Sequence, residues 1–110
     1  MSKDNDALQD IVNAATHVLD FIRGSDKELF LDDWKTCSAV LYQLTVIGEA
    51  VKRLSKDFRD AHPEIPWALM AGMRDHLIHG YDLTDWDEVW KTADTDVPDL
   101  LNRIYPILKK

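Results

Sequence analysis

The apolar residues of this chain recur at intervals of three and four, and this spacing constrains its fold more than any other feature. Between residues 6 and 23 the stripe comprises Leu8, Ile11, Val12, Ala15, Val18, Leu19 and Ile22. Such a stripe is one face of an amphipathic helix, whereas the alternation typical of strands is absent. Gly24 is a suitable C-terminal stop. The sequence therefore predicts an all-α protein whose first helix covers residues 6–23.

A second long helix is predicted over residues 33–58. Its apolar set is Cys37, Val40, Leu41, Leu44, Ile47, Val51, Leu54 and Phe58, and Trp34, Leu41 and Gly48 add a second side. A helix that is apolar on more than one side needs more than one neighbour. We expect one neighbour to be the first helix and the other to be a second copy of the chain, which predicts a homodimer. Gly48 in mid-helix indicates a close approach, and Glu49 is either a surface charge or the partner of an arginine across a helix interface.

The remaining elements are expected to be shorter. Ser25 and Glu28 resemble a capping box, so a short helical turn should follow, with Phe30 and Leu31 closing the end of the core. Two prolines bracket the break at residues 62–67. A third helix is predicted over residues 67–78, with core candidates Leu69, Met70, Met73 and Leu77. The last helical region should begin at Thr84 or Asp85, and Pro98 should break or restart it.

Composition bounds the class of protein. A chain of 110 residues allows a single domain over 1–110. The net charge of −7 argues against general coating of nucleic acid, although it permits a small RNA site or a basic protein partner. One cysteine, Cys37, rules out an internal disulfide and fits a reducing cytoplasm. There is no apolar run of membrane-spanning length, and the polar N-terminus predicts no signal peptide. The basic run of Lys52, Arg53, Lys56 and Arg59 is either a solvated face or a contact to an RNA backbone.

The richest chemistry lies in residues 73–81. Arg74 is a permanent cation with a fork of donors suited to phosphate, and His79 can exchange a proton near neutral pH. Tyr81 carries a hydroxyl that could bind or be modified. The bland alternative is that these side chains pair locally or pack at the edge of the core. His76 is a spare histidine, and His76 with His79 is only a pair, so no metal site is predicted.

Five motifs then stand in a familiar order. They are Ile47-Gly48-Glu49-Ala50, Ile65-Pro66-Trp67, Gly72-Met73-Arg74, His79-Gly80-Tyr81 and Val89-Trp90. In order and spacing the chain resembles the HepT-like branch of the HEPN proteins, over nearly its whole length. The resemblance implies an up-and-down helical bundle that dimerises through its long helices, with Arg74 and His79 of both protomers in one composite site. Asp75 would either orient Arg74 or weaken its binding of anions.

The resemblance also implies a function. Proteins of this kind are toxins of a two-gene, type II or VII-like toxin–antitoxin module, and they cleave RNA without metal or other cofactor. The partner would be a small MNT-type nucleotidyltransferase that adenylylates the tyrosine matching Tyr81. The chemistry agrees, because RNA carries its own nucleophile, the 2′-hydroxyl. His79 could act as base or acid and Arg74 could stabilise the phosphorane. The alternative is a non-catalytic helical subunit that binds and regulates a nucleotidyltransferase, and a third possibility is an orphan helical dimer.

Overall fold

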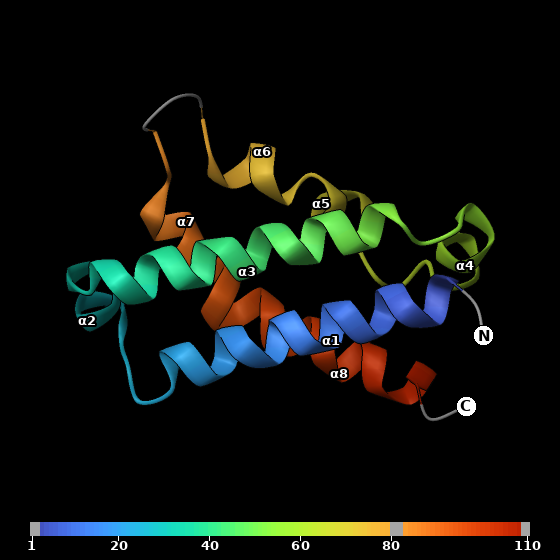
Figure 1. The fold of residues 1–110 in the computed structure, drawn as a ribbon, viewed down its shortest axis with the longest axis horizontal. Helices are drawn as coiled ribbons and strands as arrows, with labels where there is room; N and C mark the ends of the chain where they lie inside the picture. The colour runs from blue at the N-terminus through green and yellow to red at the C-terminus, as the bar shows by residue number, and fades with distance from the viewer. Residues whose placement is uncertain (1–2, 80–82, 109–110) are drawn as a thin grey trace.

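The computed structural model describes residues 3–79 and 83–108. Figure 1 shows two long helices, α1 (Lys3–Ile22) and α3 (Trp34–Lys52), lying side by side and running in opposite directions. The short α2 (Lys27–Asp32) joins them. The chain then returns through α4 (Lys56–Ala61), α5 (Trp67–Ala71) and α6 (Met73–Leu77). It closes with α7 (Trp86–Lys91), the π-helical turn η1 (Thr92–Asp96) and α8 (Val97–Leu108). The predicted all-α, up-and-down architecture is confirmed.

The core forms where α1, α3 and α8 meet. On α1, every member of the predicted stripe is buried except Leu19, which is half-buried. Val40, Leu44, Ile47 and Val51 of α3 and Leu100 and Ile104 of α8 are also buried. Burying each such aliphatic side chain contributes about 1.5 to 3 kcal/mol. The expectation that the first helix is one neighbour of the second is therefore confirmed.

The second helix is shorter than predicted, because it ends at Lys52 rather than at residue 58. Leu54 remains buried at the break. A new helix, α4, starts at Ser55, whose hydroxyl accepts a hydrogen bond from the backbone N–H of Phe58 at 3.0 Å. Asp4 of α1 holds this turn by accepting from the backbone N–H and the hydroxyl of Ser55, at 2.7 and 2.8 Å. The break therefore depends on a contact to a residue that is distant in sequence.

Two smaller predictions about α2 are also corrected. Asp26, not Ser25, caps the helix, because its carboxylate accepts from the backbone N–H of Leu29 at 2.9 Å. Phe30 is fully buried, whereas Leu31 is exposed. A carboxylate is as good an N-cap as a hydroxyl, so the observed N-cap is one residue later than the predicted one.

The predicted third helix is divided at Gly72 into α5 and α6. Met70, Met73 and Leu77 are buried as expected, but Leu69 is 49% exposed, so its assignment to the core is wrong. Gly48 of α3 lies under this junction, where an added Cβ would be only 3.0 Å from the carbonyl oxygen of Met70. The close approach expected at Gly48 is confirmed, and the element that approaches is the α5–α6 pair of the same chain.

The last helical region begins close to the predicted position. Asp85 is the N-cap of α7, with its carboxylate accepting from the backbone N–H of Glu88 at 3.1 Å. The chain continues through η1 without a break, and Pro98 occupies the first turn of α8, where its missing N–H is tolerated. Across the described residues, no helix combines the length and the apolar character needed to cross a membrane.

Candidate active site

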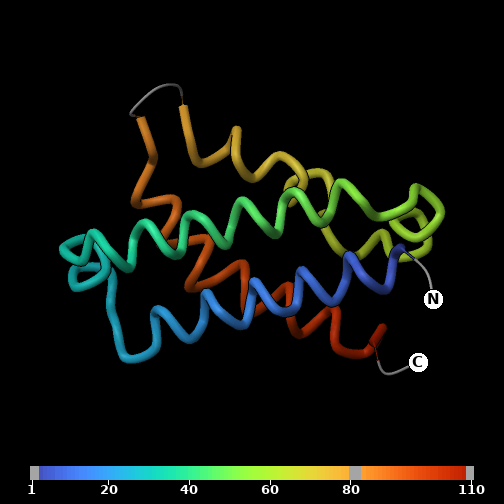
Figure 2. The backbone as a smooth tube through the Cα atoms, in the orientation of Figure 1, coloured from blue at the N-terminus to red at the C-terminus, as the bar shows by residue number. Residues whose placement is uncertain are grey.

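The segment that joins α6 to α7 is held at its base by backbone hydrogen bonds. Ile78 and Thr84 form an antiparallel bridge, the N–H of His79 donates to the carbonyl of Leu83 at 2.7 Å, and the N–H of Asp85 donates to Leu77 at 2.8 Å. Figure 2 shows the two stems of this segment rising side by side from α6 and α7. His79 therefore lies on a stem with a defined backbone. Tyr81, the predicted modification site, lies outside the described residues.

Arg74 lines a groove of about 410 Å³ between α3, α6 and α7. The other lining residues are Trp34, Ser38, Leu41, Tyr42, Thr45, Ile78, Thr84 and Trp86. Among the described residues the side chain of Arg74 makes no hydrogen bond and no ion pair. Its guanidinium therefore keeps all its donors available for an anion.

His79 follows Ile78, which lines the same groove as Arg74. Its side chain is exposed, and within the described part of the chain its ring makes no hydrogen bond. Arg74 thus comes from the start of α6, and His79 comes from the stem that follows the end of α6. Both are accessible to a substrate, as a general acid–base group and an anion-binding group must be.

The three supporting candidates have different surroundings. Asp75 is exposed and forms no ion pair with Arg74, so no contact in the described chain orients Arg74 through Asp75. Glu49 is exposed and pairs with Lys52 at 3.1 Å, as the surface-charge interpretation expects within one chain. His76 is engaged: its Nε2 lies 3.0 Å from Oε2 of Glu88.

The basic run at the end of α3 is largely neutralised by neighbouring acids. Lys52 pairs with Glu49, Lys56 pairs with Asp60 at 2.6 Å, and Arg53 pairs with Asp10 of α1 at 2.5 Å. Three of the four cations in this run therefore have a carboxylate partner, whereas the side chain of Arg59 on α4 has none among the described residues. This arrangement favours a solvated, charge-balanced face over a contact to an RNA backbone.

Trp34 and Leu41 were expected on a second apolar side of the helix, but the groove that they line with Tyr42 and Trp86 was not predicted. Trp34 at the start of α3 and Trp86 at the start of α7 meet edge to face, with ring centroids 5.4 Å apart. Trp34 is 68% exposed and Tyr42 is 65% exposed. The signal was present in the spacing of Trp34, Ser38, Leu41, Tyr42 and Thr45, which recur at intervals that place them on one side of a helix. This side of α3 faces away from the core.

Two other kinds of site can be described briefly. The Cys37 thiol is buried and donates to the carbonyl of Phe30 at 3.1 Å. Burial raises the pKa of this thiol, and the nearby charge of Asp33 adds to the effect. The place of Cys37 in the apolar set of α3 is thus confirmed, and a raised pKa leaves less of the reactive thiolate. In the part of the chain that the structure describes, no three His, Cys, Asp or Glu side chains are grouped to hold a metal ion.

Comparison with known proteins agrees with the resemblance seen in the motifs. The family model described as "Ribonuclease HepT-like" matches residues 11–107. "Probable ribonuclease HepT" of Thermococcus cleftensis is 44% identical over 104 residues, 94% of each chain. A "Putative RNase" of Methanocaldococcus jannaschii is 39% identical over 102 residues, 93% of this chain and 88% of the relative. One of the same name from Caldanaerobacter subterraneus is 36% identical over 103 residues, 94% and 92% of the two chains. No solved structure matches the chain. From the motifs, the helical architecture and these matches, the chain belongs to the ribonuclease HepT-like family.

Proposed function

We propose that this protein is a metal-independent endoribonuclease toxin, and that Arg74 and His79 carry out the cleavage. The observation that carries the proposal is that the Arg74 guanidinium has no partner among the described residues and lies in an open groove. The same groove is lined by Ile78, the residue before His79. An unpaired arginine loses nothing to a competing carboxylate when a phosphate arrives. Membership of a ribonuclease family supports the same chemistry.

The reaction needs no nucleophile from the protein. The 2′-oxygen of a ribose attacks the adjacent phosphorus and loses its proton to a histidine acting as base. Arg74 stabilises the negative charge that develops on the phosphorane oxygens. The bond from phosphorus to the 5′-oxygen then breaks, and that oxygen takes up a proton from a histidine acting as acid. The products are a 2′,3′-cyclic phosphate and a free 5′-hydroxyl.

An RNA cleavage assay in EDTA tests this proposal. Arg74→Ala and His79→Ala should each reduce the rate by about a hundredfold or more, the usual scale for such groups. Arg23→Ala and His17→Ala are the controls, because both residues are exposed on or just beyond α1 and neither lines the groove. Activity that requires added Mg²⁺ would contradict the mechanism. A wild-type protein that binds a nucleotidyltransferase but never cleaves RNA would support the non-catalytic alternative.

The homodimer is proposed to form over the groove face of α3. One chain has one Arg74 and one His79, whereas the reaction needs a base and an acid. A second copy seated on Trp34 and Tyr42 would cover exposed aromatic area and bring a second pair of site residues to the first. Large aromatic side chains of this kind often carry most of the binding energy of an interface.

Light scattering tests the dimer. Trp34→Ala should weaken association by about thirtyfold, which is what a loss of about 2 kcal/mol predicts for an interface hot spot. Tyr105→Ala is the control, because Tyr105 is an exposed aromatic on α8 outside the groove. Cleavage should fall together with dimerisation. A wild-type protein that remains a 12.7 kDa monomer at micromolar concentration would contradict the proposal.

Tyr81 is proposed as the site at which an MNT-type nucleotidyltransferase antitoxin adds AMP. It follows His79 by two residues, so a nucleotide on its oxygen would bring negative charge toward Arg74 and repel the RNA backbone. Mass spectrometry after co-expression tests the assignment. Tyr81→Phe should abolish the added mass, and Tyr105→Phe should leave it unchanged. Wild-type levels of modification on Tyr81→Phe would show that another residue is the acceptor.

A further inference from the structure

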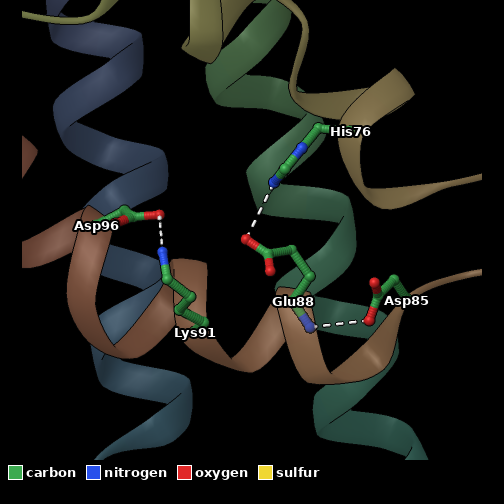
Figure 3. Close-up of polar contacts among 5 residues, drawn as sticks. All are labelled: His76, Asp85, Glu88, Lys91 and Asp96. Atoms are coloured by element: carbon green, nitrogen blue, oxygen red, sulfur yellow. Dashed lines mark hydrogen bonds and ion pairs between the residues drawn. The ribbon is translucent and has the colours of Figure 1, made fainter.

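His76 and Glu88 form a polar link across the base of the segment that carries His79. His76 lies on α6 and Glu88 lies on α7, and the two side chains meet between Nε2 and Oε2 at 3.0 Å. Figure 3 shows them pointing toward one another, with Asp85 bonded to the backbone N–H of Glu88. Asp85 caps α7, so Glu88 projects from a helical turn whose start is fixed. The contact therefore joins two defined elements rather than two mobile loops.

The helix α6 needs such a link. It contains only five residues, too few to be stable by itself. Met73 and Leu77 bury one side of it. Among the described residues, the bond from His76 to Glu88 is the one side-chain hydrogen bond that α6 makes to another element. Residues two apart on a helix point in different directions. A bond at His76 therefore limits the rotation of α6 that would turn Arg74 out of the groove.

The same bond closes the His79 stem from outside. The backbone bonds from His79 to Leu83 and from Asp85 to Leu77 join residues that lie between His76 and Glu88 in the chain. We propose that His76 and Glu88 act as a positioning clamp, which holds Arg74 in its groove and the His79 stem against α7. The effect on catalysis rests on the proposed ribonuclease function, whereas the effect on the stem does not.

A clamp must be distinguished from a catalytic histidine. A histidine bonded to a carboxylate can also serve as a general base through its free nitrogen. Glutamine separates the two roles at position 76, because its amide N–H can donate to Glu88 but its side chain cannot take up a proton at neutral pH. A clamp tolerates His76→Gln, and a general base does not.

The first arm of the experiment measures amide hydrogen exchange in the wild type and in His76→Ala, His76→Gln and Glu88→Ala. His76→Ala and Glu88→Ala should each raise the exchange of the His79 and Asp85 amides by about fivefold. His76→Gln should restore most of the protection. Asp96→Ala is the matched control, because the side chain of Asp96 is 29% exposed, against 27% for Glu88, but it pairs with Lys91 and not with α6. It should leave the exchange of both amides unchanged.

The second arm measures RNA cleavage with the same proteins. His76→Ala and Glu88→Ala should lower kcat by about tenfold and change KM little, because the reacting groups are misplaced rather than removed. The double variant should lose no more than either single variant, since both remove the same bond. His76→Gln should recover kcat to within about threefold of wild type.

The outcomes are separable. Unchanged exchange at His79 and Asp85 in both alanine variants overturns the clamp, whether or not the protein cleaves RNA. A His76→Gln variant that loses as much activity as His79→Ala overturns the positioning role and makes His76 a catalytic base. A wild type without ribonuclease activity defeats the proposed function alone, because the exchange arm still decides whether the clamp exists.

Discussion

The α1–α3 pair and the flank that carries Arg74 and His79 are built in different ways. The pair consists of helices of 20 and 19 residues whose facing sides are fully buried aliphatic groups. The flank consists of helices of five and six residues joined by a short hydrogen-bonded segment. Its polar residues, Arg74, Asp75, His76 and His79, are exposed. Local stability depends on buried apolar contacts, so the pair should hold the fold while the flank is free to carry chemistry.

The difference shows how a small all-α protein can keep an open site. A cation inside the α1–α3 contact would require a partner that cancels its charge. On the flank, the exposed Arg74 needs no such partner, because water solvates its charge. The flank is attached to the pair where Gly48 lets α5 and α6 approach α3 closely. Substitutions in the α1–α3 pair should therefore mainly lower stability, and substitutions in the flank should mainly lower activity. The variants below run from the largest to the smallest expected change in the free energy of unfolding.

The largest loss is expected for Leu44→Ala in α3. Leu44 is fully buried, so its removal leaves a cavity and should lower the free energy of unfolding by about 2 to 5 kcal/mol. Chemical denaturation measures this change. Leu69→Ala makes the same chemical change at an exposed position and should cost far less. Equal losses for the two variants would show that α3 does not carry the stability of the fold.

A smaller loss is expected for Gly48→Leu at the junction of the two regions. The new side chain would collide with the backbone of Met70, so α5 and α6 must move, at a cost of about 1 to 3 kcal/mol. Thermal melting and RNA cleavage should both be impaired, because α6 carries Arg74. Gly72→Ala is the control, since its added Cβ would meet the nearest atom at an ordinary 3.5 Å. Full activity in Gly48→Leu would mean that α6 need not pack closely on α3.

A pH effect is expected at the start of α3. Hydrogen bonds from the hydroxyl and then the backbone N–H of Thr36 lower the pKa of Asp33 below its ordinary value of 3.8. Because the folded-state pKa is depressed, the stabilisation is present above pH 3.8 and is lost as the pH falls through the folded-state pKa. Asp33→Asn keeps a capping side chain that does not titrate. Melting curves between about pH 5 and pH 3 should show a steeper decline for wild type than for this variant. Parallel declines would contradict the assignment.

The smallest change in stability is expected for Arg74→Ala. Arg74 has no partner among the described residues, so its removal should alter the free energy of unfolding by no more than about 0.5 kcal/mol. Denaturation of Arg74→Ala beside Leu44→Ala tests the contrast directly. A loss comparable to that of Leu44→Ala would place Arg74 in the structural framework and end the division between the two regions.

Local patterns account for the parts of the fold that were predicted correctly. The stripe on α1 predicted a helix, and all the residues of that stripe except Leu19 are buried. Gly48 indicated a close approach, which α5 and α6 supply. The motif residues indicated the family that the comparisons show. The stripe and the motifs are local patterns, so the sequence is enough to indicate them. Gly48 indicates a close approach without indicating which element approaches.

Contacts between distant residues decided the rest. The apolar pattern ran on past Lys52, but Ser55 and Asp4 end the helix there through hydrogen bonds that join α1 to α4. The clamp pairs His76 with Glu88 across a segment that returns the chain, and the groove pairs Trp34 with Trp86. By itself the sequence determined the helices and the candidate residues Arg74 and His79. Only the tertiary structure decided which of them are left unpaired and what surrounds them, because packing, and not local spacing, brings these partners together.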